Sequence, residues 1–286
     1  MATAPDARGE LLSFDWLGAC QRAVEGLRDV LAANPTSNER VIETGETGGG
    51  GDQTLVIDAA AEDAVFAELD RLHAAGARFT AVSEERGYVD FGSDEALVVI
   101  DPIDGSMNAK RGLTHHALSI AVADGPTMAD VVFGYVYDLG PGEEWCATRG
   151  GGALLNGAPL ADAPPERRKR DGRLELVAIE SADPRWLAAS SEALVSVTGR
   201  LRAIGSIAVS LCQVAATRVD GMATLWKCRA VDAAAAQLVV RESGGKVAFT
   251  AMDDPLGAPL DLEPRSPVVA ARTDRALAEL ATLPSV

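Results

Sequence analysis

The sequence predicts a layered α/β fold, in which helices pack against sheets, and three observations support this prediction. Residues 11–34 carry an amphipathic stripe, residues 79–150 contain several apolar strand-like segments in succession, and strands alternate with helices after residue 174. Apolar strands without intervening helices favour antiparallel pairing, whereas alternation of strands and helices favours helices packed on a sheet. With 286 residues, the chain is long enough for one large domain or for two lobes around a shared core.

The first two elements are expected to be helices. The stripe within residues 11–34 recurs at steps of three and four, which is the spacing of a helix with one buried face. It consists of Leu17, Cys20, Val24, Leu27 and Leu31. A second helix is expected from Asp58 to Ala75. The glycine-rich segment between them, residues 43–52, lacks the Lys and Ser or Thr of a P-loop, so we interpret it as a linker or mobile flap.

The rest of the chain is expected to form strands first, and then strands mixed with helices. Strands of the first half are expected at residues 79–85, 96–105, 116–125, 131–140 and 143–150. The second half is expected to add strands at 174–180, 201–205, 222–227, 246–250 and 267–271, and helices near 184–197, 206–219, 231–243 and 273–282. A basic, proline-led stretch at residues 164–173 is the candidate boundary between an N-terminal lobe, residues 1–170, and a C-terminal lobe, residues 171–286.

Charge and composition exclude some classes of partner. The chain has 26 Lys and Arg against 42 Asp and Glu, a formal charge of −16. Such a protein repels polyanions, so we expect neither a nucleic-acid partner nor a membrane surface. No segment reaches the roughly 18 consecutive apolar residues of a membrane span. The four cysteines are far apart and lack metal-ligand spacing, so we expect reduced, apolar thiols in a cytoplasmic protein.

The segment VVIDPIDGSMN, residues 98–108, carries the strongest chemical signal. An apolar strand leads into Asp101 and Asp104, and two carboxylates about 4 Å apart repel each other by about 4 kcal/mol. Such a pair needs a proton, a cationic partner or a metal, and oxygen ligands favour Mg²⁺ over Zn²⁺. Gly105 permits an unusual backbone conformation, and a helix beginning at Ser106 would leave free amides that suit a phosphate.

Two other acidic residues are candidates for the same site. Glu84 lies at the end of the strand before this segment, and Asp232 lies at the head of a strongly apolar helix. Each has a simpler interpretation when it is taken alone. A glutamate at a strand end is commonly solvated, and an aspartate at a helix start commonly caps the helix.

Together these segments resemble the inositol monophosphatase family, within a wider group that includes fructose-1,6-bisphosphatase and the nucleotide bisphosphate phosphatases. Six segments match family motifs in order. They are IDAAAED (57–63), SEE (83–85), DPIDGSMN (101–108), RGGGALLNG (149–157), IGSIAVSLCQVAATRVDG (204–221) and VDAAAAQLVVRESGG (231–245). The resemblance covers about residues 10–280. It implies an αβαβα sandwich, usually a homodimer, that hydrolyses a small phosphate monoester such as an inositol, sugar or cyclitol phosphate.

The resemblance also implies roles for individual residues. Two or three Mg²⁺ ions would activate the attacking water, and their implied ligands are Glu84, Asp101, the carbonyl of Ile103, Asp104 and Asp232. Gly105 and Ser106 would bind the phosphate. Asp58 and Ser106, with Glu84, would be the catalytic residues that position the water, and Gly205 and Ser206 would contact the substrate.

The sequence departs from the family near Asp232. Inositol-hydrolysing members carry an acidic residue seven positions before this aspartate, where this chain has Leu225, and Val231 replaces a tryptophan. On a strand, Leu225, Lys227 and Arg229 would share a face, so the two cations would meet a second anionic group of the substrate. Their alternative role is to offset nearby carboxylates or to face solvent. The substrate therefore stays open, with histidinol phosphate, a sugar bisphosphate or a nucleotide phosphate as alternatives, and so does a non-catalytic regulatory role on the same fold.

Overall fold

The structure is a computed structural model that describes residues 11–47, 49, 53–160 and 164–283. The helices are α2 (Trp16–Ala33), α3 (Ser37–Arg40), α4 (Val56–Ala74), α5 (Ser106–Arg111), the 3₁₀ helix η1 (Met128–Asp130), α6 (Pro184–Ala189), α7 (Ser191–Val197), α8 (Ile207–Ala215), α9 (Ala230–Glu242) and α10 (Asp274–Leu280). The strands are β1 (Glu43–Thr47), β2 (Gln53–Leu55), β3 (Thr80–Ser83), β4 (Gly87–Asp90), β5 (Leu97–Asp104), β6 (Ala117–Ala123), β7 (Val131–Asp138), β8 (Glu143–Thr148), β9 (Gly152–Leu155), β10 (Ala158–Pro159), β11 (Val177–Glu180), β12 (Leu201–Arg202), β13 (Gly221–Thr224), β14 (Lys246–Phe249) and β15 (Val268–Ala271).

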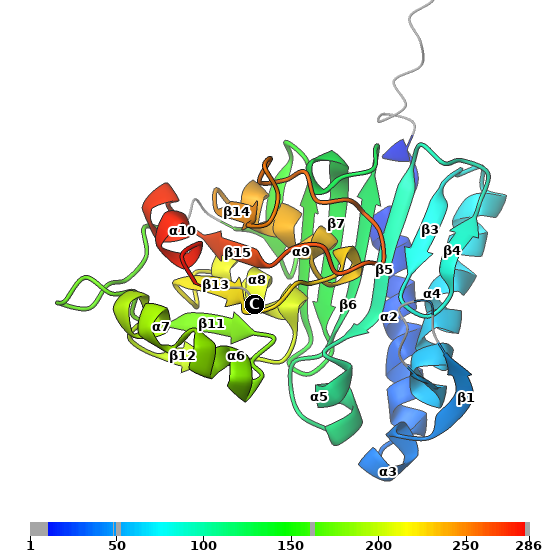
Figure 1. Cartoon of the computed structure of the whole chain (residues 1–286). Coiled ribbons are helices and arrows are strands. Elements are labelled where there is room, and N and C mark those ends of the chain that lie inside the picture. The colour runs from blue at the N-terminus through cyan, green and yellow to red at the C-terminus, as the bar shows by residue number, and fades with distance from the viewer. Residues whose placement is uncertain (1–10, 48, 50–52, 161–163, 284–286) are drawn as a thin grey trace, which may run out of the picture.

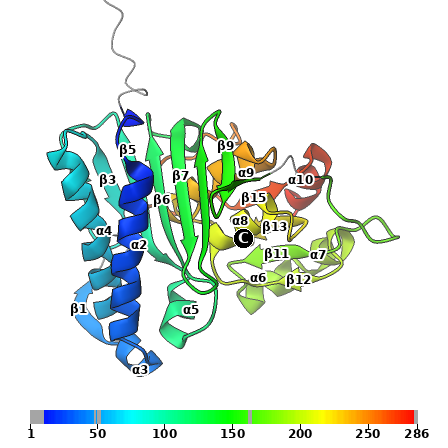
Figure 2. The same ribbon diagram turned by 180° about the vertical axis from the view of Figure 1, so that it is seen from behind.

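Two mixed sheets form the frame of the molecule. The larger sheet has eight strands in the order β10-β9-β8-β7-β6-β5-β3-β4, and the smaller has five in the order β12-β11-β13-β15-β14. Helices α2 and α4 cover the outer face of the larger sheet, α8 and α9 lie between the sheets, and α7 and α10 cover the outer face of the smaller sheet (Figures 1 and 2). This arrangement confirms the αβαβα sandwich.

Alternation along each strand divides the core among these layers. On β5, Val98 and Ile100 point to α2 and α4, whereas Val99 points to the middle layer. On β11, Val177 and Ile179 belong to the outer core of the smaller sheet, whose other members include residues of α7, α10, β13 and β15. Strands that are apolar on both faces are expected in a sheet that helices cover on both sides.

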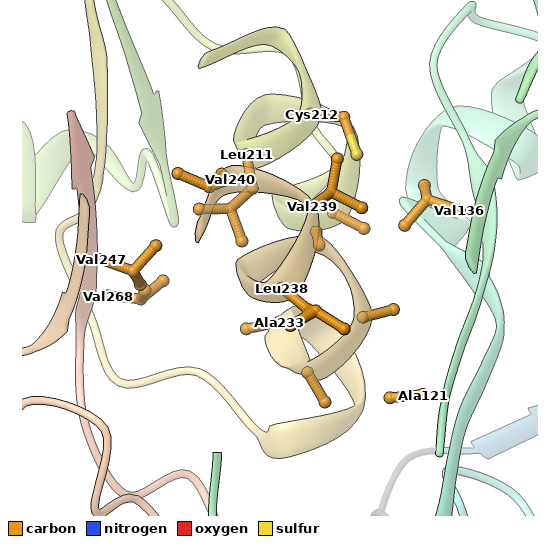
Figure 3. Close-up of a cluster of buried hydrophobic side chains, with 14 of the residues drawn as sticks. Ala121, Val136, Leu211, Cys212, Ala233, Leu238, Val239, Val240, Val247 and Val268 are labelled. Carbon is orange, nitrogen blue, oxygen red and sulfur yellow. The ribbon is translucent and has the colours of Figure 1, made fainter. Parts of the chain in front are cut away.

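Helix α9 forms the centre of the middle layer. Figure 3 shows its apolar residues between Ala121 and Val136 of the larger sheet and Val247 and Val268 of the smaller one. Its run of alanines permits close packing, and a Cβ atom at Gly134 of β7 would lie 2.5 Å from the carbonyl oxygen of Ala235. The beginning of α9, where Asp232 lies, is therefore held against the larger sheet.

Most of the predicted elements are confirmed, and several predictions need correction. The segment expected as a loop at 43–52 contains strand β1 at its start, while residue 48 and residues 50–52 lie outside the described residues. The single helix expected near 184–197 is two helices, because Ser190 ends α6 and begins α7. The strands expected at 201–205 and 222–227 end at Arg202 and Thr224, and the helix expected near 206–219 ends at Ala215. The boundary between lobes near residue 170 stays a prediction.

The four cysteines are free and buried. Among the described residues, no helix is long and apolar enough to cross a membrane.

Candidate metal centre

An irregularity in β5 places Asp101 and Asp104 on the same face of the sheet. Residues three apart on a regular strand point to opposite faces. Here Asp101 pairs with Ser119 and Asp104 pairs with Ala117, so three steps along β5 match only two along β6. The extra residue reverses the alternation, as in a β-bulge. Both carboxylates consequently face the middle layer, as Val99 does.

Asp232 completes a cluster of three carboxylates. One oxygen atom of each of Asp101, Asp104 and Asp232 lies within 4.8 Å of the other two. The three residues are only 2%, 6% and 8% exposed, respectively. Asp232 also accepts a hydrogen bond from the Arg229 amide at 2.8 Å, so it caps α9 as well as joining the cluster. The capping role expected for Asp232 is therefore present, and its role as a metal ligand stays a prediction.

Burial and mutual repulsion disfavour the charged form of these groups. Burial raises the pKa of Asp101 well above its ordinary value, and the carboxylates of Glu84, Asp104 and Asp232 raise it further. Burial, followed by the Asp232 carboxylate, raises the pKa of Asp104 to about 8. Burial raises the pKa of Asp232 as well, although Arg229 opposes this change. The cluster therefore needs protons or cations to be stable.

Glu84 reaches this cluster from the neighbouring strand. Strand β3 runs parallel to β5 with Ser83 opposite Ile100, so Glu84, the residue directly after β3, lies beside Asp101. The turn that carries Glu84 is held by Glu62, which is buried and accepts hydrogen bonds from the Ser83 hydroxyl and, at 3.1 Å, from the Arg86 amide. Only its place in the motif IDAAAED pointed to Glu62 before its contacts were known.

The carboxylate of Asp104, the last residue of β5, lies against the beginning of α8 and is held there by hydrogen bonds. The hydroxyl of Ser206 donates to it at 2.5 Å, and the amides of Ala208 and Ile207 donate at 2.7 and 3.3 Å. The same hydroxyl accepts from the Val209 amide and caps α8. Ser206 was predicted to contact substrate, and the contacts seen here are with a carboxylate of the cluster and with its own helix.

Asn108 and Glu180 join the turn after β5 to the loop before α8. The Asn108 amide donates to the carbonyl of Ile204 at 2.8 Å and to that of His115 at 3.0 Å. Glu180, at the end of β11, is buried and accepts from the amides of Ile204 and Gly205 at 2.9 and 3.0 Å. Site prediction missed both residues, because their partners are distant in the sequence; the Asn of DPIDGSMN was the only available signal.

Gly105 and Gly205 permit this close approach. Both have left-handed backbone conformations, with φ of 87° and 88°. A Cβ atom on Gly105 would lie 2.8 Å from the Gly205 carbonyl oxygen, and one on Gly205 would lie 2.6 Å from the Asn108 amide nitrogen. Helix α5 begins at Ser106 directly after Gly105, as the sequence predicted.

The predicted face of Leu225, Lys227 and Arg229 does not form, because β13 has already ended. Leu225 is fully buried in the outer core of the smaller sheet, and Lys227 is exposed. Trp226 stacks on Trp186 of α6 with ring centroids 5.0 Å apart. Arg229 points to the cluster, where its guanidinium lies 2.8 Å from the Glu84 carboxylate and 3.5 Å from that of Asp232. The alternative role, to offset carboxylates, is the one that Arg229 has here.

Comparisons with known proteins identify a family for this chain. The model of the inositol monophosphatase family matches residues 14–283. The chain belongs to the inositol monophosphatase family. It is 30% identical over 246 residues to a fructose-1,6-bisphosphatase/inositol-1-monophosphatase of Methanothermobacter thermautotrophicus, covering 82% of this chain and 84% of the relative. It is also 30% identical over 229 residues to Nus factor SuhB of Haemophilus influenzae, covering 79% and 82%.

A solved structure agrees on the fold. The crystal structure of an inositol monophosphatase-fructose 1,6-bisphosphatase superposes with a TM-score of 0.79 at 24% identity, covering 94% of this chain and 100% of the other. Members of the inositol monophosphatase family are phosphatases that act on small phosphorylated substrates and are generally metal-dependent. The buried carboxylates described above suit that chemistry.

The donor set of this family member fits a hard divalent cation. Three buried carboxylates within 4.8 Å offer only oxygen ligands, and Glu84 lies beside them. Oxygen donors in this number favour Mg²⁺, Mn²⁺ or Ca²⁺ over softer metals. The carbonyl of Ile103 lies in the same turn, where the Ile103 amide donates to Asp101 at 2.9 Å.

The other predicted catalytic residues, Asp58 and Ser106, lie on α4 and α5. Asp58 is buried in the first turn of α4, and α4 packs on the face of β5 opposite to the cluster. Ser106 is partly buried at the start of α5. Their pairing to orient a water molecule stays a prediction.

Proposed function

We propose that this protein is a Mg²⁺-dependent phosphatase that hydrolyses a small phosphate monoester, of an inositol, a related cyclitol or a sugar. The observation that carries the proposal is the convergence of Asp101, Asp104 and Asp232 from two separate elements into one buried cluster. Three buried carboxylates are costly unless a cation joins them, so an arrangement that keeps them together points to a function.

The residues have distinct tasks in the proposed reaction. Asp101, Asp104 and Asp232 would hold Mg²⁺, which supplies the charge that activates water and neutralises the phosphate oxygens. Glu84, the other predicted carboxylate ligand, is paired with Arg229 in the structure. The backbone amides of Gly105 and Ser106 bind the phosphate. Asp58 and the hydroxyl of Ser106 orient the attacking water. The protein thus contributes position and charge, without a covalent phospho-enzyme.

The supporting loops determine how well the ligands are positioned. Ser206 and the first amides of α8 fix the Asp104 carboxylate, and Asn108 ties the turn after β5 to the loop before α8. Ligands held by such outer contacts are oriented before a metal binds. Loss of these contacts is expected to weaken metal binding as well as turnover.

The position of Leu225 bears on the substrate. A buried carboxylate that pairs with substrate hydroxyls discriminates strongly, and here the corresponding position is an apolar residue inside the outer core. We therefore propose that inositol hydroxyls are not read from this position. A sugar or cyclitol monoester accepted by shape is our preferred substrate class, and histidinol phosphate and nucleotide phosphates are the alternatives to compare.

The test is release of inorganic phosphate from a panel of phosphate monoesters, with Mg²⁺ or with excess chelator. We expect turnover that requires Mg²⁺ and that falls by at least a hundredfold in Asp104→Asn, because this change removes a ligand charge while keeping its shape. Asp94→Asn, at an exposed position in the turn before β5, is the control for the loss of one carboxylate. Full activity in chelator would overturn the assignment.

A regulatory protein on the same fold is the second candidate. The observation that favours it is that some relatives bear the name Nus factor SuhB. The two candidate functions differ in whether they require the carboxylate cluster. Binding to a protein or nucleic-acid partner that persists in Asp104→Asn, together with no phosphate release from any monoester, would favour the regulatory role.

A further inference from the structure

The guanidinium of Arg229 lies inside the group of carboxylates that we assign to metal binding. Its Nη2 atom is 2.8 Å from Oε1 of Glu84 and 3.5 Å from Oδ1 of Asp232. The arginine side chain is only 21% exposed, and those of Glu84 and Asp232 are 19% and 12% exposed. One cation therefore already bridges two of the proposed ligands, one from the turn after β3 and one from α9.

The loop before α9 holds Arg229 in this place. Its backbone amide donates to the other oxygen of Asp232 at 2.8 Å, so backbone and side chain contact the same carboxylate. Burial lowers the pKa of Arg229, but the carboxylates of Asp232, Glu84 and Asp101 outweigh it and raise the pKa above its ordinary value. The guanidinium is charged at every pH at which the protein is folded.

A divalent ion between Glu84 and Asp232 would compete with this arginine. Mg²⁺ binds oxygen atoms at about 2.0–2.1 Å and tolerates little distortion. Such an ion would need the carboxylate oxygens that now face Nη2, and it would meet a like charge in a site where burial strengthens repulsion. Asp101 lies beside Glu84 on the neighbouring strand, and Asp104 is held by the Ser206 hydroxyl and the first amides of α8.

We infer that Arg229 takes the place of one divalent ion at the Glu84 side of the cluster, so that this chain binds one ion fewer than the same chain without that guanidinium. The inference rests on the proposed function, because it presumes that the remaining carboxylates bind metal. Glu84 then serves as the partner of Arg229 instead of as a metal ligand. Arg229 is in this view a positioning residue, which sets the charge and the number of ions at the site.

The experiment counts bound ions without substrate. Equilibrium binding of Mn²⁺ alone, with free Mn²⁺ followed by electron paramagnetic resonance, gives the number of sites for the wild type, Arg229→Gln and Arg229→Ala. Glutamine keeps much of the size and hydrogen bonding of arginine, so this variant remains informative if alanine prevents folding. Lys227→Ala removes the same charge from the same loop, but its side chain is exposed, so it is the matched control.

We expect one additional Mn²⁺ site in both Arg229 variants and an unchanged number in Lys227→Ala. Thermal unfolding in chelator supplies a second readout. The Arg229 variants should unfold at a lower temperature than the wild type in chelator and should regain stability when Mn²⁺ is added. Equal site numbers in the wild type and both Arg229 variants would overturn the inference while leaving the proposed function intact. No Mn²⁺ binding by any of the proteins would overturn both.

Discussion

The Asp104→Asn variant tests how the buried Asp104 carboxyl group changes the free energy of unfolding of the metal-free protein with pH. Burial and the Asp232 carboxylate raise the pKa of Asp104 from 3.8 to about 8. The folded state therefore holds a proton on Asp104 up to about pH 8, whereas the unfolded state releases it near pH 4. The stability contributed by this group is fully present below the unfolded pKa and is lost as the pH rises toward the folded pKa. One proton is worth about 1.4 kcal/mol for each pH unit in that window.

Asparagine resembles a protonated aspartate but has no proton to release. In chelator, the free energy of unfolding of Asp104→Asn should therefore rise relative to the wild type by about 1.4 kcal/mol per pH unit between pH 5 and 7. Urea unfolding at pH 5, 6 and 7 measures this difference. With Mg²⁺ the trend should reverse, because metal and proton compete for the wild-type carboxylate. A difference that does not change with pH in chelator would refute this reasoning.

Two further predictions test the packing around Gly205 and the role of the Ser106 hydroxyl in positioning the attacking water. Gly205→Ala should lower the free energy of unfolding by about 1–2 kcal/mol, because alanine is strained in the left-handed backbone conformation. It should lower it further because the new Cβ atom would lie 2.6 Å from the Asn108 amide nitrogen. Gly157→Ala is the control for the backbone strain alone, because Gly157 has a φ of 75° and open space around it. Equal losses of stability in the two variants would show that the contact with Asn108 adds no cost. Ser106→Ala should lower kcat far more than KM, whereas Ser106→Thr keeps the hydroxyl and should be tolerated. Wild-type kinetics in Ser106→Ala would show that the hydroxyl does not position the water.

The order of elements was predictable because apolar periodicity is a local property of the chain. Strands β5 to β8 and helices α8 to α10 follow from runs and stripes that burial on one or both faces requires. The proximity of Asp101 and Asp104 was also predictable from the tight motif between a strand and Gly105. The reason for it was not, because three residues on a regular strand would separate the two carboxylates, and only the irregular pairing with β6 brings them together.

Contacts between residues that are distant in the chain could not be predicted from a single sequence. Glu62 and Glu180 hold the turns that carry the site, yet each reads as an ordinary acidic residue until its partners are known. The strand expected through residue 227 was wrong after Thr224, because Leu225 still packs in the same outer core as Ala223 of β13 and so continues the apolar pattern beyond the end of the strand. That error gave Arg229 a substrate role, whereas its partner is Glu84, which lies far away in the sequence.

The position of a bound ion tests the central claim most directly. Crystals soaked with Mn²⁺ and inorganic phosphate, measured for anomalous scattering, locate the metal without any assumption about substrate. We expect a peak bonded to the carboxylates of Asp101, Asp104 and Asp232, with phosphate near the amides of Gly105 and Ser106 and with Arg229 still paired to Glu84. Active crystals that show no metal among these three aspartates would contradict the assignment of the cluster as the catalytic centre.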